Sequence, residues 1–314
     1  MRSSTDIVSP PAPVSFFEAF IYWLKLGFIS FGGPAGQIAL MHEELVERRR
    51  WISDRRFLHA LNYTMMLPGP EAQQLATYIG WLMHGTRGGI MAGVLFILPS
   101  LFILMSLTWA YLAFGDRPEI AGILYGIKPA VVAIVAFAVY RIGSRAISNT
   151  VLLAISLLAF AAIFISGILY PALLTFPYII LTAALIGLVG GRVAPDKFKT
   201  GGRHGMSNKH YGPALIDDQT IRTAHTHFTW TRVIAYALIG VLLWAIAIGW
   251  LTAWQGWQGT LAQIAWFFTK AALLTFGGAY AVLPYVYQGA VEHYHWLTAT
   301  QMIDGLALGE TTPG

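Results

Sequence analysis

Apolar residues along this chain are gathered into long runs that short polar segments separate. Five of these runs are long enough to span a lipid bilayer as helices, at about 89–113, 119–140, 150–168, 171–190 and 231–254. Three further runs are apolar but interrupted by glycine or proline: 16–47, 53–84 and 261–291. The pattern predicts an all-α integral membrane protein in which continuous helices accompany broken ones.

Composition agrees with lipid as the main solvent of the chain. Charged residues make up 11% of the 314 residues and hydrophobic residues 56%, whereas a soluble domain carries about 25% charged residues. The net charge of +5 is the sign expected of basic cytoplasmic loops in a membrane protein, and we prefer this interpretation to nucleic-acid binding. Because the chain has no cysteine, disulfides, thiolate metal sites and a cysteine nucleophile are excluded.

An internal repeat relates the start of the chain to its end. Phe31-Gly32-Gly33 recurs as Phe276-Gly277-Gly278, an offset of 245 residues (276 − 31 = 245). The same offset relates further pairs: Lys25 and Lys270, Glu47 and Glu292, Trp51 and Trp296, and Pro68-Gly69 and Pro313-Gly314. The repeat predicts a polar tail (1–14), a first copy (15–191), a basic cytoplasmic linker (192–230) and the start of an incomplete second copy (231–314).

The arginines predict how the two copies are oriented. Five arginines between Arg48 and Arg56 mark the loop after the first broken run as cytoplasmic. Since the N-terminus is also expected there, 16–47 is predicted to enter the membrane and return as a re-entrant hairpin, and the same argument applies to 53–84. The matching loop of the second copy, Glu292–Thr300, has no lysine or arginine, which predicts an inverted repeat. The alternative for 16–47 is a single kinked span.

The breaks in the apolar runs are candidate anion-binding positions. Gly32-Gly33-Pro34 and Pro68-Gly69-Pro70 each interrupt a helix and leave backbone N–H groups at the start of the next arm, where a partial positive charge attracts anions. Gly277-Gly278 repeats the first break in the second copy, with Ala279 in place of the proline. The alternative for the glycine pairs is close packing between helices.

Lysines within the apolar runs add positive charge to this candidate site. Three of the six lysines lie at predicted membrane depth: Lys25, Lys128 and Lys270. A charge inside a membrane costs at least about 2.5 kcal/mol, which favours a cationic, water-accessible pocket around them. The alternative is that the lysines form structural ion pairs with Glu18 or Glu71.

Polar side chains near the breaks are further candidates. Gln37, Gln73 and Gln74 can donate hydrogen bonds to an oxyanion, and solvated helix faces are the alternative. Glu71 follows Pro70 directly and is a candidate for proton coupling, while a structural role in complementing the helix dipole is the alternative.

The same segments resemble the chromate ion transporter (CHR) family. The residues that carry the resemblance are Phe31-Gly32-Gly33-Pro34, Trp51, the block from Leu67 to Ala76, Tyr78-Ile79-Gly80 and Gly126-Ile127-Lys128-Pro129. The resemblance implies a multi-pass protein of the bacterial inner membrane, of the long two-domain type, that exports chromate, a substrate related to sulfate. Compared with the long two-domain type, this sequence ends early, at Gly314, which predicts that its second copy is truncated at the C-terminus.

Inverted repeats with broken helices are the architecture of many secondary transporters. We therefore expect efflux of chromate or a related tetrahedral oxyanion, with the lipid bilayer as surroundings and a homodimer as a candidate assembly. Two alternatives are an anion channel and a membrane-embedded enzyme acting on a lipid-linked substrate. The chain has no His-Glu-x-x-His sequence, and we expect no catalytic residues, no metal site and no cofactor. Chromate and sulfate are not distinguished by any residue pattern.

Overall fold

The computed structural model describes residues 11–115, 117–169, 175–198, 211–218, 226, 228–275 and 279–313. In this part of the chain the secondary structure is helical, apart from one isolated bridge between Ile52 and Ile216. The predicted all-α class is confirmed. Residues 1–10 of the predicted tail, and 199–210 and 219–225 of the predicted linker, lie outside the described residues.

The helices are, in chain order, α1 (Phe16–Ile29), α2 (Gly33–His42), the π-helical turn η1 (Glu43–Arg48), α3 (Asp54–Met65), α4 (Glu71–Phe114), α5 (Pro118–Ala146), α6 (Thr150–Leu169), α7 (Thr175–Val193), α8 (Pro195–Phe198), α9 (Trp230–Gln255), α10 (Thr260–Leu274), the 3-10 turn η3 (Ala279–Val282), α11 (Leu283–Tyr287), the π-helical turn η4 (Gln288–His293) and α12 (Ala299–Glu310).

Helices occur at all five of the predicted continuous runs. Of the described helices, α4 and α9 are long and apolar enough to cross a membrane. Shorter apolar stretches lie within α6, α7 and α10. The number of crossings stays a prediction.

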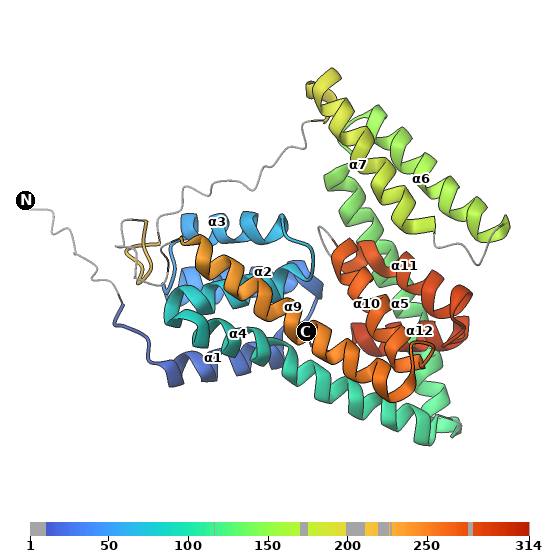
Figure 1. Cartoon of the computed structure of the whole chain (residues 1–314), viewed down its shortest axis with the longest axis horizontal. Coiled ribbons are helices and arrows are strands. Elements are labelled where there is room, and N and C mark those ends of the chain that lie inside the picture. Colours follow the sequence, from blue (N-terminus) through green and yellow to red (C-terminus); the bar gives the residue numbers. More distant parts are fainter. Residues whose placement is uncertain are drawn as a thin grey trace, which may run out of the picture. The chain divides into compact units, whose positions relative to one another are not determined.

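The described residues form two compact units. Unit 1 draws on 1–23, 38–94 and 210–278, and unit 2 draws on 24–37, 95–209 and 279–314. In unit 1, α9 packs against α10. In unit 2, α12 packs against α5, and α6 lies beside α7 (Figure 1). Each unit therefore contains residues of both sequence copies.

The interrupted runs are broken helices. The run 16–47 is divided between α1 and α2, where Gly32 and Gly33 have φ angles of +89° and +67°. The run 53–84 is divided between α3 and α4, where Gly69 has a φ of +118°. Glycine adopts positive φ without the steric cost that a side chain adds. These residues therefore end one helix and change the direction of the chain before the next helix begins.

The sequence repeat is matched by a repeat of local structure. The turns η1 and η4 begin and end at positions 245 residues apart, and so do α3 and α12. Arg50 and His295, also 245 apart, share a φ of +54°. Trp51 N donates to Leu45 O and Trp296 N to Ala290 O, each at 2.8 Å. The inverted orientation and the domain bounds stay predictions.

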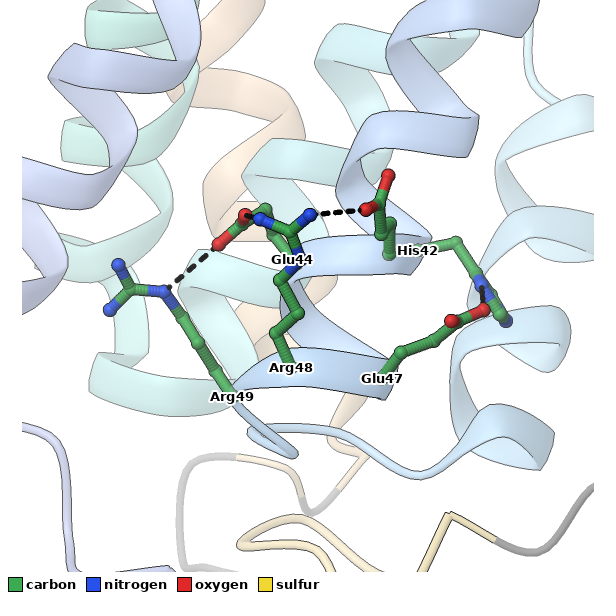
Figure 2. A network of polar contacts seen from close by, with 6 residues as sticks. His42, Glu44, Glu47, Arg48 and Arg49 are labelled. Atoms are coloured by element: carbon green, nitrogen blue, oxygen red, sulfur yellow. Dashed lines mark hydrogen bonds and ion pairs between the residues drawn. The ribbon is translucent and has the colours of Figure 1, made fainter.

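Charged side chains form a network at the end of η1 (Figure 2). Arg48 and Arg49 contact the Glu44 carboxylate at 3.0 and 3.4 Å. Arg49 also lies 3.7 Å from Glu18 in the first turn of α1. The chain therefore leaves this broken segment close to where it entered it, within unit 1.

Three further contacts bring separate chain segments together in unit 1. His84 Nε2 lies 3.0 Å from the backbone oxygen of Val14, which precedes α1. Leu215 N donates to Arg50 O at 2.9 Å, and Ser53 N donates to Ile216 O at 3.0 Å. The linker thus pairs by backbone hydrogen bonds with the arginine-rich loop.

Within α4 the chain makes a tight helical hairpin. His84 and Gly85 have non-helical backbone angles, so α4 consists of two arms. A Cβ added to Gly80 would lie 2.5 Å from the Ala92 Cβ and 2.6 Å from Gly88 O. The arms approach closely because these positions carry almost no side chain.

Replacing Gly80 by alanine should therefore destabilise unit 1. Since the new methyl group has no space, we expect Gly80→Ala to lower the free energy of unfolding by about 1–3 kcal/mol. The measurement is the midpoint of thermal unfolding in detergent, followed by tryptophan fluorescence. Gly240→Ala in α9, where a Cβ would meet nothing within 4 Å, is the matched control and should be neutral or slightly stabilising. Equal midpoints for the two variants would contradict the close approach.

Candidate functional site

A cavity of about 140 Å³ lies in unit 2 at the first helix break. Three parts of the chain surround it: the break between α1 and α2, the start of the segment after the second glycine pair, and the end of α12. The lining residues are Gly32, Gly33, Pro34, Tyr280, Leu283, Gly309, Glu310 and Thr312. Since one water molecule takes up about 30 Å³ in the liquid, a tetrahedral oxyanion has room here.

The glycine pair shapes one wall of this cavity. Gly33 begins α2 and Pro34 lies in its first turn, where proline is favoured because its nitrogen needs no helical acceptor. A Cβ on Gly33 would lie 3.1 Å from the Tyr280 hydroxyl oxygen. Glycine is thus required here both for its positive φ and for the space that Tyr280 occupies.

The cavity lining also carries a carboxylate. Tyr280 Oη donates a hydrogen bond to Glu310 Oε2 at 3.1 Å, and Glu310 is half-buried at the end of α12. No lysine or arginine is present among the described residues that line the cavity. Glu310 is the charged side chain of this lining, and a helix N-terminus such as the start of α2 carries a partial positive charge.

The sequence interpretation did not single out Glu310 or Tyr280. Glu310 corresponds to Met65 of the first copy (310 − 65 = 245), and Tyr280 corresponds to Ala35 (280 − 35 = 245). Because neither residue is repeated in the first copy, the internal repeat does not identify them. A carboxylate within an apolar helix of a membrane protein is itself a functional signal, and this signal could have identified Glu310.

The predicted lysines lie elsewhere or are not described. Lys25 is exposed on α1, and Lys270 on α10 is half-buried with its Nζ 6.0 Å from the Trp266 ring. Neither lines the cavity. The side chain of Lys128 lies outside the described residues. Glu18, one of the alternative partners for Lys25, has the Arg49 guanidinium 3.7 Å away.

The second break of the first copy is stabilised from two directions. Gly69 N donates to Thr275 O at 2.8 Å, and Gln74 Nε2 donates to Pro68 O at 2.7 Å. Thr275 directly precedes the second glycine pair in the sequence. Gly277 and Gly278 themselves lie outside the described residues.

Two of the predicted glutamines support the breaks. Gln37 is buried, and its Nε2 lies 3.5 Å from Ser30 O across the first break. Gln74 acts in the same way at the second break. Gln73 is half-buried and Glu71 is buried, both in the first turn of α4 beside Pro70.

A family model described as "Chromate transporter" matches residues 17–188 and 262–314 of this chain. The chain belongs to the chromate transporter family. The predicted resemblance is therefore confirmed, and with it the membrane character of the protein.

Curated members of the chromate transporter family align over most of the chain. It is 30% identical to the chromate transport protein of Cupriavidus metallidurans over 95% of this chain and 64% of that protein. It is 32% identical to the chromate transport protein of Pseudomonas aeruginosa over 99% of this chain and 66% of that protein. The chain thus spans about two thirds of the length of these relatives. No solved structure matches it.

Replacing Gly33 by alanine tests how the cavity is built. Since alanine is strained at a φ of +67° and its methyl group would press on the Tyr280 hydroxyl, we expect Gly33→Ala to cost about 1–2 kcal/mol. In the Gly33→Ala background, Tyr280→Phe should cost less than it does alone, because it removes the crowded oxygen. Thermal unfolding of the four proteins measures this coupling. Gly305→Ala on α12, with open space around it, is the control; strict additivity would contradict the contact.

Proposed function

We propose that this chain carries out secondary active efflux of chromate, or of a related tetrahedral oxyanion, across the bacterial inner membrane. The observation that carries the proposal is the cavity at the Gly32-Gly33-Pro34 break, in a chain of the chromate transporter family. An irregular backbone at membrane depth lines a wet cavity in many transporters. The relatives named above as chromate transport proteins support the substrate class.

The start of α2 is the proposed first contact of the anion. A helix N-terminus presents N–H groups without helical partners and about half a positive elementary charge. Pro68-Gly69-Pro70 and Gly277-Gly278 are the corresponding breaks, and Lys25, Lys128 and Lys270 are proposed to add positive potential along the route. A membrane potential that is negative inside favours the exit of an anion by about 2.3 kcal/mol per elementary charge for each 100 mV.

Contacts in unit 1 support the proposed topology. The segments before α1, after η1 and after the first arm of α4 lie close together, as do the arginine-rich loop and the linker residues 215–216. Each of these was predicted to face the cytoplasm. Their proximity is what re-entrant hairpins require, because such a hairpin begins and ends on one side of the membrane.

Chromate uptake into everted inner-membrane vesicles tests the proposed function. Respiring everted vesicles have a positive interior, so an exporter of anions should accumulate chromate in their lumen. We expect vesicles that contain this chain to accumulate more chromate than vesicles without it, and collapse of the membrane potential to remove most of the difference. Equal uptake by the two preparations, at verified levels of inserted protein, would refute the proposal.

Cysteine labelling tests the orientation of the two copies. Arg55 and Thr300 are matched, exposed positions in the first turns of α3 and α12 (300 − 55 = 245). In whole cells, an impermeant thiol reagent should label Thr300→Cys but not Arg55→Cys, and in everted vesicles the pattern should reverse. Because the chain has no native cysteine, the unmodified protein gives the background. Labelling of both variants from the same side would contradict the inverted repeat.

A further inference from the structure

The cavity at the first helix break contains a group that opposes its proposed ligand. Glu310 lines the same cavity of about 140 Å³ as Gly32, Gly33 and Pro34. An ionised glutamate and a dianion that occupy the same cavity repel each other. A protonated glutamic acid removes this repulsion and can donate a hydrogen bond to the oxyanion.

We propose that Glu310 is a proton-binding site, and that its protonation admits the oxyanion to the cavity. The inference rests on the proposed function, since it names the ion that binds together with the exported anion. Tyr280 positions the carboxyl group: its hydroxyl donates to Oε2 at 3.1 Å, so the proton would be carried by the other oxygen, Oε1.

The groups around Glu310 are consistent with this role. The start of α2 contributes Gly32, Gly33 and Pro34, and the segment after the second glycine pair contributes Tyr280 and Leu283. Among these, the titratable side chain is that of Tyr280.

Other charged groups lie near Glu310 in the sequence or on a neighbouring helix. On α12, the buried Asp304 accepts a hydrogen bond from Tyr111 Oη at 3.1 Å. The neighbouring helix α5 carries Lys128, whose side chain lies outside the described residues. Glu71, the candidate proton carrier of the sequence interpretation, does not line this cavity.

Linked binding has two consequences. If one proton binds with each anion, the apparent affinity for the anion falls about tenfold per pH unit once Glu310 loses its proton. The pair that crosses the membrane then carries one negative charge instead of two. The membrane potential still favours export, but by half as much for each anion.

Calorimetric titration of the purified full chain with sulfate tests the proposal. Sulfate stays a dianion from about pH 4 to about pH 8, so protonation of sulfate itself does not contribute to the result. This range begins near the usual pKa of a glutamate side chain. We expect the affinity to fall with rising pH, with uptake of about one proton per sulfate, measured from the dependence of the heat on the buffer. In Glu310→Gln the affinity should be independent of pH and the proton uptake should vanish.

Matched variants make the outcome specific. Glu119→Gln, the same change at an exposed position in the first turn of α5, should behave as the unmodified chain does. Tyr280→Phe keeps the carboxyl group but removes the donor that stabilises its ionised form, so the fall in affinity should move to higher pH. This second variant tests the proposal even if Glu310→Gln does not fold.

The possible failures are distinct. Sulfate binding that is equally tight across the pH range, or proton uptake that persists in Glu310→Gln, would overturn the proton site and leave the proposed function standing. A shift of the Tyr280→Phe curve to lower pH would also overturn it. A chain that binds neither sulfate nor chromate at any pH would contradict the proposed function itself, and the proton site with it.

Discussion

A helix that breaks inside an apolar layer must find partners for its exposed backbone groups. In this chain, the hydrogen bond from Gly69 N to Thr275 O supplies one such partner. Its donor lies in the second break of the first copy, and its acceptor directly precedes the glycine pair of the second copy. At the cavity, the first break of the first copy lies beside the end of α12, which belongs to the second copy. The breaks of the first copy therefore lie against segments of the second copy. This arrangement agrees with two compact units that each contain residues of both copies.

Much of this arrangement could be predicted from the sequence, because the information is local. Glycine and proline in apolar runs predicted the breaks, and the offset of 245 residues aligned segments that share helix bounds and turn geometry. The partners across the breaks could not be predicted in this way. That Tyr280 contacts Gly33 and bonds to Glu310 depends on how distant helices pack. The glutamines are predicted to be candidate ligands, yet Gln74 donates to a carbonyl oxygen at a break. The amide group of a glutamine can donate equally well to a bound anion or to a backbone carbonyl oxygen.

The two copies differ at positions whose side chains are not needed for the helix caps or the turns that the copies share. The first copy has Ala35 and Met65 where the second has Tyr280 and Glu310, and the last two add a hydroxyl and a carboxyl group to the cavity. By contrast, the cap of α3 and that of α12 use the same chemistry: the hydroxyls of Ser53 and Thr298 each accept from a backbone N–H three residues on. Local structure is thus retained by caps and glycines, while chemistry is added at the exchanged positions.

The loop after each π-helical turn shows how charge can change without loss of packing. In the first copy, the Arg49 guanidinium lies over the Trp51 ring, 5.0 Å from its centroid. In the second copy, Tyr294 takes the place of Arg49 and stacks on Trp296, with 4.4 Å between the ring centroids and 6° between the planes. Guanidinium and phenol are both flat groups that stack on indole, so the contact survives the exchange while the positive charge does not. Because basic loops set the orientation of membrane segments, an exchange of this kind is what the predicted inverted repeat requires.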